Sequence, residues 1–151
     1  MKNEQPVSDC QYAAQCCLGY HTRRAQRVLT TMYDQALEPA GIRSTQFTLM
    51  NAIELLHIPT INQLSEALII DRTTLTRNLR LLENSGYIKI QPGRDRREKA
   101  ITLTQEGKKT LKQALTLWKE IHHQVQELVG EERFERLLRD LNVVENLLSN
   151  K

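Results

Sequence analysis

The chain has 151 residues, of which 40% are hydrophobic and 26% are charged. This composition supports one packed domain and excludes a disordered or collagen-like chain. Apolar stretches are short and interrupted by charge, and the first ten residues lack an apolar signal core, so we expect a cytoplasmic protein without a membrane span. The three cysteines are an odd number and two of them are adjacent, which argues against a secreted disulfide framework.

The net charge of +3 is unevenly distributed along the chain. Residues 71–99 contain eight Lys or Arg side chains and four Asp or Glu side chains, a surplus of four, so the rest of the chain is net −1. A surplus confined to one segment indicates a basic patch on an otherwise balanced surface.

The first half of the chain contains helical patterns separated by turn residues. Residues 10–38 carry apolar side chains at gaps of three, four and seven, which predicts one helix that the following Pro-Ala-Gly sequence ends. A second helix is expected after Ser44 or Thr45 as N-cap, and Pro59 stops it. Thr60 then caps a short helix that ends at residue 68.

The next helix begins at Asp71, a good N-cap, and is closed by Gly86. Its inward stripe consists of leucines at spacings of four and three: Leu75, Leu79 and Leu82. Its other face is polar and basic, and carries Arg72, Thr73, Thr74, Thr76, Arg77 and Arg80.

A two-stranded ribbon and two long helices complete the chain. Residues 87–90 alternate like a strand, residues 91–95 read as a turn, and residues 99–103 return as a second strand. The basic tip of this ribbon contains Arg94, Asp95, Arg96 and Arg97. A helix then begins at Thr104 as N-cap and breaks at Gly130, and a last helix follows. Both carry narrow apolar seams of the coiled-coil kind, which favour packing against a partner subunit.

A short helix, a tight turn, a polar-faced helix and an arginine-tipped ribbon form a winged helix-turn-helix pattern. The major groove of DNA admits one α-helix, whose first residues reach the base edges. Thr73 and Thr74 can bond bases or phosphates, and Arg77 suits guanine. Arginines at the ribbon tip suit the negative potential of a narrow minor groove. Taken alone, an Arg-rich hairpin is more often a solvated loop, but its place after this helix favours DNA contact.

The sequence resembles the MarR family of winged-helix transcription regulators over roughly residues 15–148. The resemblance is carried by Ser44-Thr45-Gln46-Phe47, Leu64-Ser65-Glu66-Ala67, the stretch from Asp71 to Gly86, and Asp95-Arg96-Arg97 followed by Leu103-Thr104-Gln105-Glu106-Gly107. It implies a mainly α fold with a small β-wing, in which a winged helix-turn-helix region at 42–103 is flanked by dimerisation helices at 1–38 and 104–151.

The resemblance also implies an obligate homodimer that binds a palindromic operator in double-stranded DNA. Asp95 and Arg97 would hold the wing in shape, and at least one of Arg94, Arg96 and Arg97 would enter the minor groove. We expect a repressor that a small ligand or cysteine oxidation releases, without enzymatic activity, cofactor or metal. The alternatives are a winged-helix protein–protein adaptor that never touches DNA, and an enzyme, for which no catalytic motif is found.

The signal that such a regulator senses stays open at this stage. Cys10, Cys16 and Cys17 are candidate redox sensors, inert small side chains, or metal ligands together with His21. In a continuous helix Cys10 and Cys17 would lie about 10 Å apart, beyond disulfide reach. A pocket for a small aromatic ligand between the dimerisation helices and the winged region would be lined by Tyr33, Phe47, Met50 and Trp118, each of which also suits the core.

Overall fold

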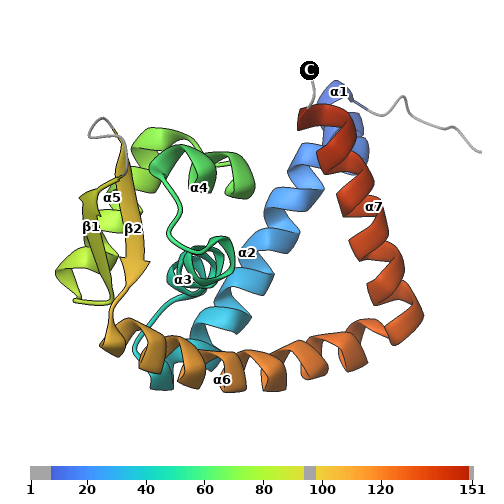
Figure 1. Ribbon diagram of the computed structural model, residues 1–151. Coiled ribbons are helices and arrows are strands. Elements are labelled where there is room, and N and C mark those ends of the chain that lie inside the picture. Colours follow the sequence, from blue (N-terminus) through green and yellow to red (C-terminus); the bar gives the residue numbers. More distant parts are fainter. Residues whose placement is uncertain (1–7, 94–97, 150–151) are drawn as a thin grey trace, which may run out of the picture.

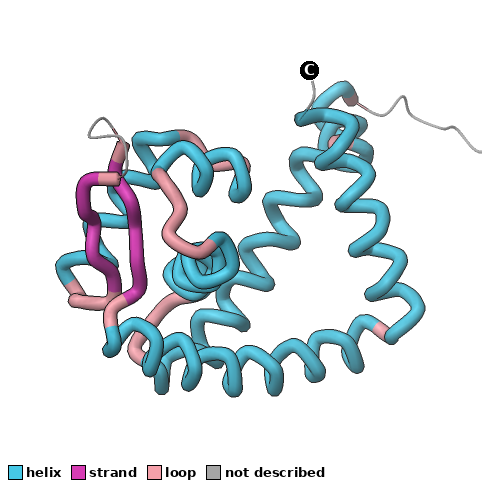
Figure 2. The backbone as a smooth tube through the Cα atoms, in the orientation of Figure 1, coloured by secondary structure: helices cyan, strands magenta, loops and turns pink. Residues whose placement is uncertain are grey.

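The computed structural model describes residues 8–93 and 98–149. In these ranges the chain is helical apart from one antiparallel ribbon, which Figure 2 shows in magenta. The elements in chain order are α1 (Asp9–Cys16), α2 (Leu18–Leu37), the 3-10 turn η1 (Glu38–Ala40), α3 (Ser44–Leu56), α4 (Ile61–Leu68), α5 (Arg72–Asn84), β1 (Ile88–Pro92), β2 (Lys99–Leu103), α6 (Gln105–Val129) and α7 (Glu131–Ser149).

One hydrophobic core joins α3, α4, α5 and the ribbon to the first half of α6 (Figure 1). The predicted inward stripe of α5 is confirmed, because Leu75, Leu79 and Leu82 are all fully buried. Met50 of α3 and Leu64 of α4 are buried against the same core. The rigid packing of this core fixes the direction of α5 and of the ribbon relative to each other.

Strands β1 and β2 pair antiparallel, with Ile90 opposite Ile101. The second strand has the predicted bounds, whereas β1 continues to Pro92 through residues that the sequence assigned to the turn. The amide of Ile101 also donates to the carbonyl of Pro59 at 3.0 Å. The ribbon is therefore held to the loop between α3 and α4 as well as to α5.

Three of the predicted helix starts are confirmed by their cap hydrogen bonds. Thr60, Asp71 and Thr104 each accept from the backbone N–H three residues ahead. The start of α3 is different: Arg43 is its N-cap residue, and Ser44 is already helical. The amide and hydroxyl of Ser44 both donate to Oδ1 of Asp34 in α2, at 2.7 and 2.6 Å, so a carboxylate from a neighbouring helix stabilises this end.

The single helix expected over residues 10–38 is wrong in one respect, because it breaks at Cys17. This residue has extended backbone angles, φ −72° and ψ 109°, and separates α1 from α2. The ring Nε2 of His21 donates to the carbonyl of Gln15 at 3.0 Å, which satisfies an acceptor released by the break. The separation of Cys10 and Cys17 along a continuous helix therefore does not apply.

The C-terminal helices extend away from the winged core. Figure 1 shows α6 running beneath the core and α7 turning back after Gly130, whose φ is +86°, toward the end of the molecule where α1 lies. No side chain of α7 that the structure describes is fully buried, although the helix carries the predicted apolar seam and Phe134 and Val144 are half-buried. Within the described ranges no helix is both long enough and apolar enough to span a membrane.

Candidate nucleic-acid interface

Helix α5 is anchored at its first turn by Asp71. The carboxylate accepts from the amide of Thr74 at 2.9 Å. Hydrogen bonds from the hydroxyl and the amide of Thr74 hold the pKa of Asp71 below its ordinary value. The cap therefore stays ionised at neutral pH, as the positive end of the helix dipole favours.

The surface of α5 divides into three faces around its buried leucines. Thr76, Arg80 and Glu83 face a groove beside the ribbon. Asn78, Leu81 and Asn84 face a second groove, whose opposite wall is the start of α3. Between these flanks, Thr73 and Arg77 lie one turn apart on the exposed outer face. An exposed helix face with a hydroxyl and a guanidinium is what a duplex groove can receive.

The three predicted threonines of α5 and Arg77 differ in the hydrogen bonds that they can still make with a ligand. The hydroxyl of Thr76 donates to the carbonyl of Arg72 at 2.6 Å, and that of Thr74 is engaged by Asp71. Both side chains are half-buried. Because each hydroxyl already donates its proton within the protein, its oxygen can only accept a hydrogen bond from a ligand. Thr73 and Arg77 are exposed, and their side chains have no hydrogen-bond partner in the described part of the chain.

The arginines of α5 have no carboxylate partner in the described part of the chain. Arg72, Arg77 and Arg80 are all exposed. Across residues 8–93 and 98–149, the single salt bridge within 4.0 Å joins Arg139 to Glu135 in α7. None of these three guanidinium groups therefore has a carboxylate within 4.0 Å among the described residues, which favours binding of a polyanion.

The tip of the wing lies outside the described residues, and with it Arg94, Asp95, Arg96 and Arg97. Their predicted roles stay predictions. The described part of the ribbon adds Lys99, which lines the groove beside α5 and which the sequence reasoning did not select. The alternation in Lys-Ala-Ile-Thr-Leu could have found it, because Lys99 shares a face with Ile101 and Leu103.

The cysteines gather at the N-terminal corner of the molecule. Cys10 lies in α1, Cys16 is its last residue and Cys17 is the link to α2, and all three are exposed free thiols. No group of three or more His, Cys, Asp or Glu side chains suited to a metal occurs among the residues that the structure describes. The exposure leaves the thiols accessible to an oxidant.

Three of the four candidate pocket residues, Phe47, Met50 and Trp118, lie in the core or pack against it, and Tyr33 is half-buried in α2. Phe47 and Met50 are buried, and the ring of Trp118 stacks on Phe47 with 6.1 Å between centroids. Burial raises the pKa of the Tyr33 phenol above its ordinary value. The grooves beside α5 are lined by other residues, so a ligand pocket at these four side chains stays a prediction.

Comparisons with known proteins give the same fold bound to DNA. The transcriptional regulator MosR of M. tuberculosis, solved in complex with DNA, is 36% identical over 89% of this chain and 97% of that one, with a TM-score of 0.81. A mutant MarR of E. coli complexed with operator DNA shares the fold at a TM-score of 0.80 and 22% identity, over 88% of this chain and 96% of that one. The HTH-type transcriptional regulator YwoH of Bacillus subtilis (strain 168), itself uncharacterized, is 27% identical over 92 residues, which are 61% of this chain and 67% of YwoH. The chain matches no protein-family model.

Proposed function

Because this chain belongs to the MarR family of winged-helix transcription regulators, we propose that it binds double-stranded operator DNA as a homodimer and represses transcription until a small ligand or an oxidant releases it. The proposal keeps the winged region at 42–103 between dimerisation regions at 1–38 and 104–151. It also includes a cytoplasmic location, where the DNA is accessible.

The observation that carries DNA binding is the outer face of α5. Its inner leucines are buried, while Thr73 and Arg77 project from its first two turns without internal partners among the described residues. Residues in the first turns of a recognition helix are those that reach base edges in the major groove. The unpaired arginines would in addition release counterions from phosphates, which supplies most of the affinity at low salt.

The support for a homodimer comes from apolar side chains that one subunit leaves in water. Among the described side chains of α7 none is fully buried, and three of its leucines are 44–49% exposed: Leu137, Leu138 and Leu141. Helix α2 exposes Leu18, Val28 and Leu29 in the same way. Full burial of such a side chain contributes about 1.5–3 kcal/mol, so a second copy that covers both helices would be strongly favoured. A dimer also supplies two recognition helices for the two halves of a palindrome.

The test of DNA binding is fluorescence anisotropy with the duplex immediately upstream of the gene, across salt concentrations. We expect tight binding by the parent that weakens steeply with salt. Arg77→Ala should lose about 1–3 kcal/mol of binding free energy. The matched control is Arg139→Ala, which removes the same charge from α7, where Arg139 already pairs with Glu135 at 3.6 Å.

Two results would contradict the proposal. If both arginine variants weaken binding equally while the dimer stays intact, α5 has no special role in the contact. If the parent binds neither this duplex nor any genomic DNA fragment offered to it in a selection, the winged helix does not bind DNA. The protein–protein adaptor then becomes the better interpretation.

The support for oxidant control is the accessibility of three thiols at the corner between α1 and α2. Both helices belong to the proposed dimerisation region, so a covalent change there can alter how two subunits meet. We expect peroxide to weaken DNA binding, thiol to restore it, and a variant with all three cysteines changed to serine to ignore the oxidant. If peroxide leaves DNA binding by the parent unchanged, small aromatic ligands become the signals to test.

A further inference from the structure

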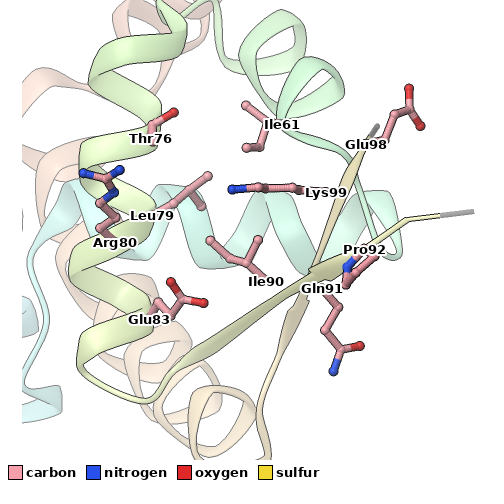
Figure 3. A pocket seen from close by; sticks show the side chains of 10 residues that line it. All are labelled: Ile61, Thr76, Leu79, Arg80, Glu83, Ile90, Gln91, Pro92, Glu98 and Lys99. Carbon is pink, nitrogen blue, oxygen red and sulfur yellow. The ribbon is translucent and has the colours of Figure 1, made fainter. Parts of the chain in front are cut away.

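A groove of about 300 Å³ separates the recognition helix α5 from the ribbon (Figure 3). Its apolar side is formed by Leu79 of α5, Ile90 of β1 and Ile61 of α4. Two basic side chains line it from different elements: Arg80 from α5 and Lys99 from β2. The groove therefore combines a rigid apolar base with charges supplied from both walls.

Lys99 occupies an inward position of the ribbon. Side chains along a strand alternate between faces, and Lys99 shares its face with Ile101 and Leu103, both of which are buried. At the open end of this face no core remains to cover the strand, and Lys99 is exposed there. Figure 3 shows its side chain reaching from β2 across the groove toward α5, so the fold directs this ammonium group at the recognition helix.

The charges in the groove are arranged unevenly. In Figure 3 the guanidinium of Arg80 points toward the Thr76 end, whereas Glu83 lies at the other end and the carboxylate of Glu98 points away. Neither carboxylate lies within 4.0 Å of a cation, since the one such pair in the described ranges is in α7. The Thr76 end of the groove therefore presents two cations that have no ion-pair partner among the residues that the structure describes.

We propose that Lys99 and Arg80 together hold one phosphate of the DNA backbone, an inference that rests on the proposed function. A helix in the major groove and a wing in the adjacent minor groove must straddle the sugar-phosphate strand that divides the two grooves. The groove between α5 and the ribbon is the place where that strand passes. Its phosphate oxygens accept hydrogen bonds, and a guanidinium and an ammonium group supply the donors.

The test compares Lys99→Gln with Lys89→Gln by anisotropy between about 50 and 200 mM salt. Lys89 is the matched control, because it carries the same charge on the same ribbon, but its alternation places it on the opposite face. Two duplexes are used: the one upstream of the gene and a scrambled one of equal composition. Lys99→Gln should flatten the slope of log K against log salt by about 1 on both duplexes, since a phosphate contact is independent of sequence. Lys89→Gln should leave the slope unchanged.

Two further variants separate this contact from a folding defect. Lys99→Arg keeps a cation at the same position and should retain the parent slope. Arg80→Gln combined with Lys99→Gln should weaken binding by less than the sum of the single effects, because both side chains hold the same phosphate.

Equal slopes for Lys99→Gln and the parent, or equal losses in the Lys99 and Lys89 variants, would overturn the inference while leaving DNA binding intact. A loss confined to the upstream duplex would also overturn it, since that would mean base reading. If the parent itself shows no salt-dependent binding to either duplex, the proposed function fails and the phosphate contact fails with it.

Discussion

Gly107 is the position at which one methyl group should disturb the junction between the wing and α6. A Cβ built there would lie 2.9 Å from the carbonyl carbon of Tyr87 and closer still to its oxygen, separations that real side chains do not show. The same oxygen accepts from the amide of Thr104 at 2.9 Å, and the hydroxyl of Thr104 donates to the carbonyl of Gly86 at 2.7 Å. The Leu-Thr-x-x-Gly motif thus joins the end of the ribbon to the first turn of α6 through backbone contacts.

The expected cost of Gly107→Ala follows from these contacts. Overpacking against backbone costs about 1–3 kcal/mol, and displacing the carbonyl of Tyr87 weakens a hydrogen bond that contributes about 0.5–1.5 kcal/mol. The higher helix propensity of alanine returns up to about 1 kcal/mol. Together these terms lower the free energy of unfolding by about 0.5–4.5 kcal/mol. The centre of this range, about 2.5 kcal/mol, corresponds to a drop in Tm of roughly 5–10 °C.

The assay is thermal unfolding followed by circular dichroism at equal protomer concentration, because association shifts the apparent stability. Gly19→Ala is the control: this glycine also lies in a helix, and a Cβ added there would meet only flexible side-chain atoms of Arg23, at 3.7–4.0 Å. That variant should be as stable as the parent or more stable. An unchanged or raised Tm for Gly107→Ala would refute the reasoning.

Two further substitutions test local features of the winged region. Ile69 is a β-branched residue at φ +50° and is 65% exposed. Ile69→Asn should therefore relieve about 1 kcal/mol of backbone strain and raise Tm. Ile70→Asn is the control and should lower Tm, because Ile70 packs against the core. Asp71→Asn keeps an N-cap acceptor but removes the charge. Because the folded pKa of Asp71 is lowered, its charge stabilises the protein above the unfolded pKa, and this contribution is lost as pH falls through the folded value. The free energies of unfolding of parent and variant, measured with urea at several pH values, should therefore become equal in acid. A difference that persists in acid would contradict this role of the Asp71 charge.

The parts of the fold that depend on short-range hydrogen bonds could be predicted from the sequence. Thr60, Asp71 and Thr104 cap helices through bonds to residues three positions away, so the pattern alone locates them. The start of α3 was misplaced because its stabilising carboxylate, Asp34, lies ten residues earlier in a different helix. The break at Cys17 could not be predicted, because Cys17 is neither proline nor glycine and the nearby Gly19 lies within α2.

The polar character of the exposed face of α5 could be predicted from the sequence, whereas the hydrogen bonds of individual side chains on that face could not. Period-3.6 spacing separated the buried leucines of α5 from its polar face. It could not show that Thr76 commits its hydroxyl proton to the carbonyl of Arg72, because that depends on the rotamer. A count of basic residues by segment does not single out Lys99, because its position depends on the strand face that it shares with Ile101.

The central claim is that two copies of this chain bind DNA through paired recognition helices. Hydroxyl-radical footprinting of the parent on the DNA upstream of its gene tests it most directly. We predict two equivalent protected patches related by a two-fold axis and centred about one helical turn, or a whole number of turns, apart on one face of the duplex. A single asymmetric patch would contradict the dimeric arrangement. If the protein binds DNA but protects no defined patch on it, the result would contradict sequence-specific binding.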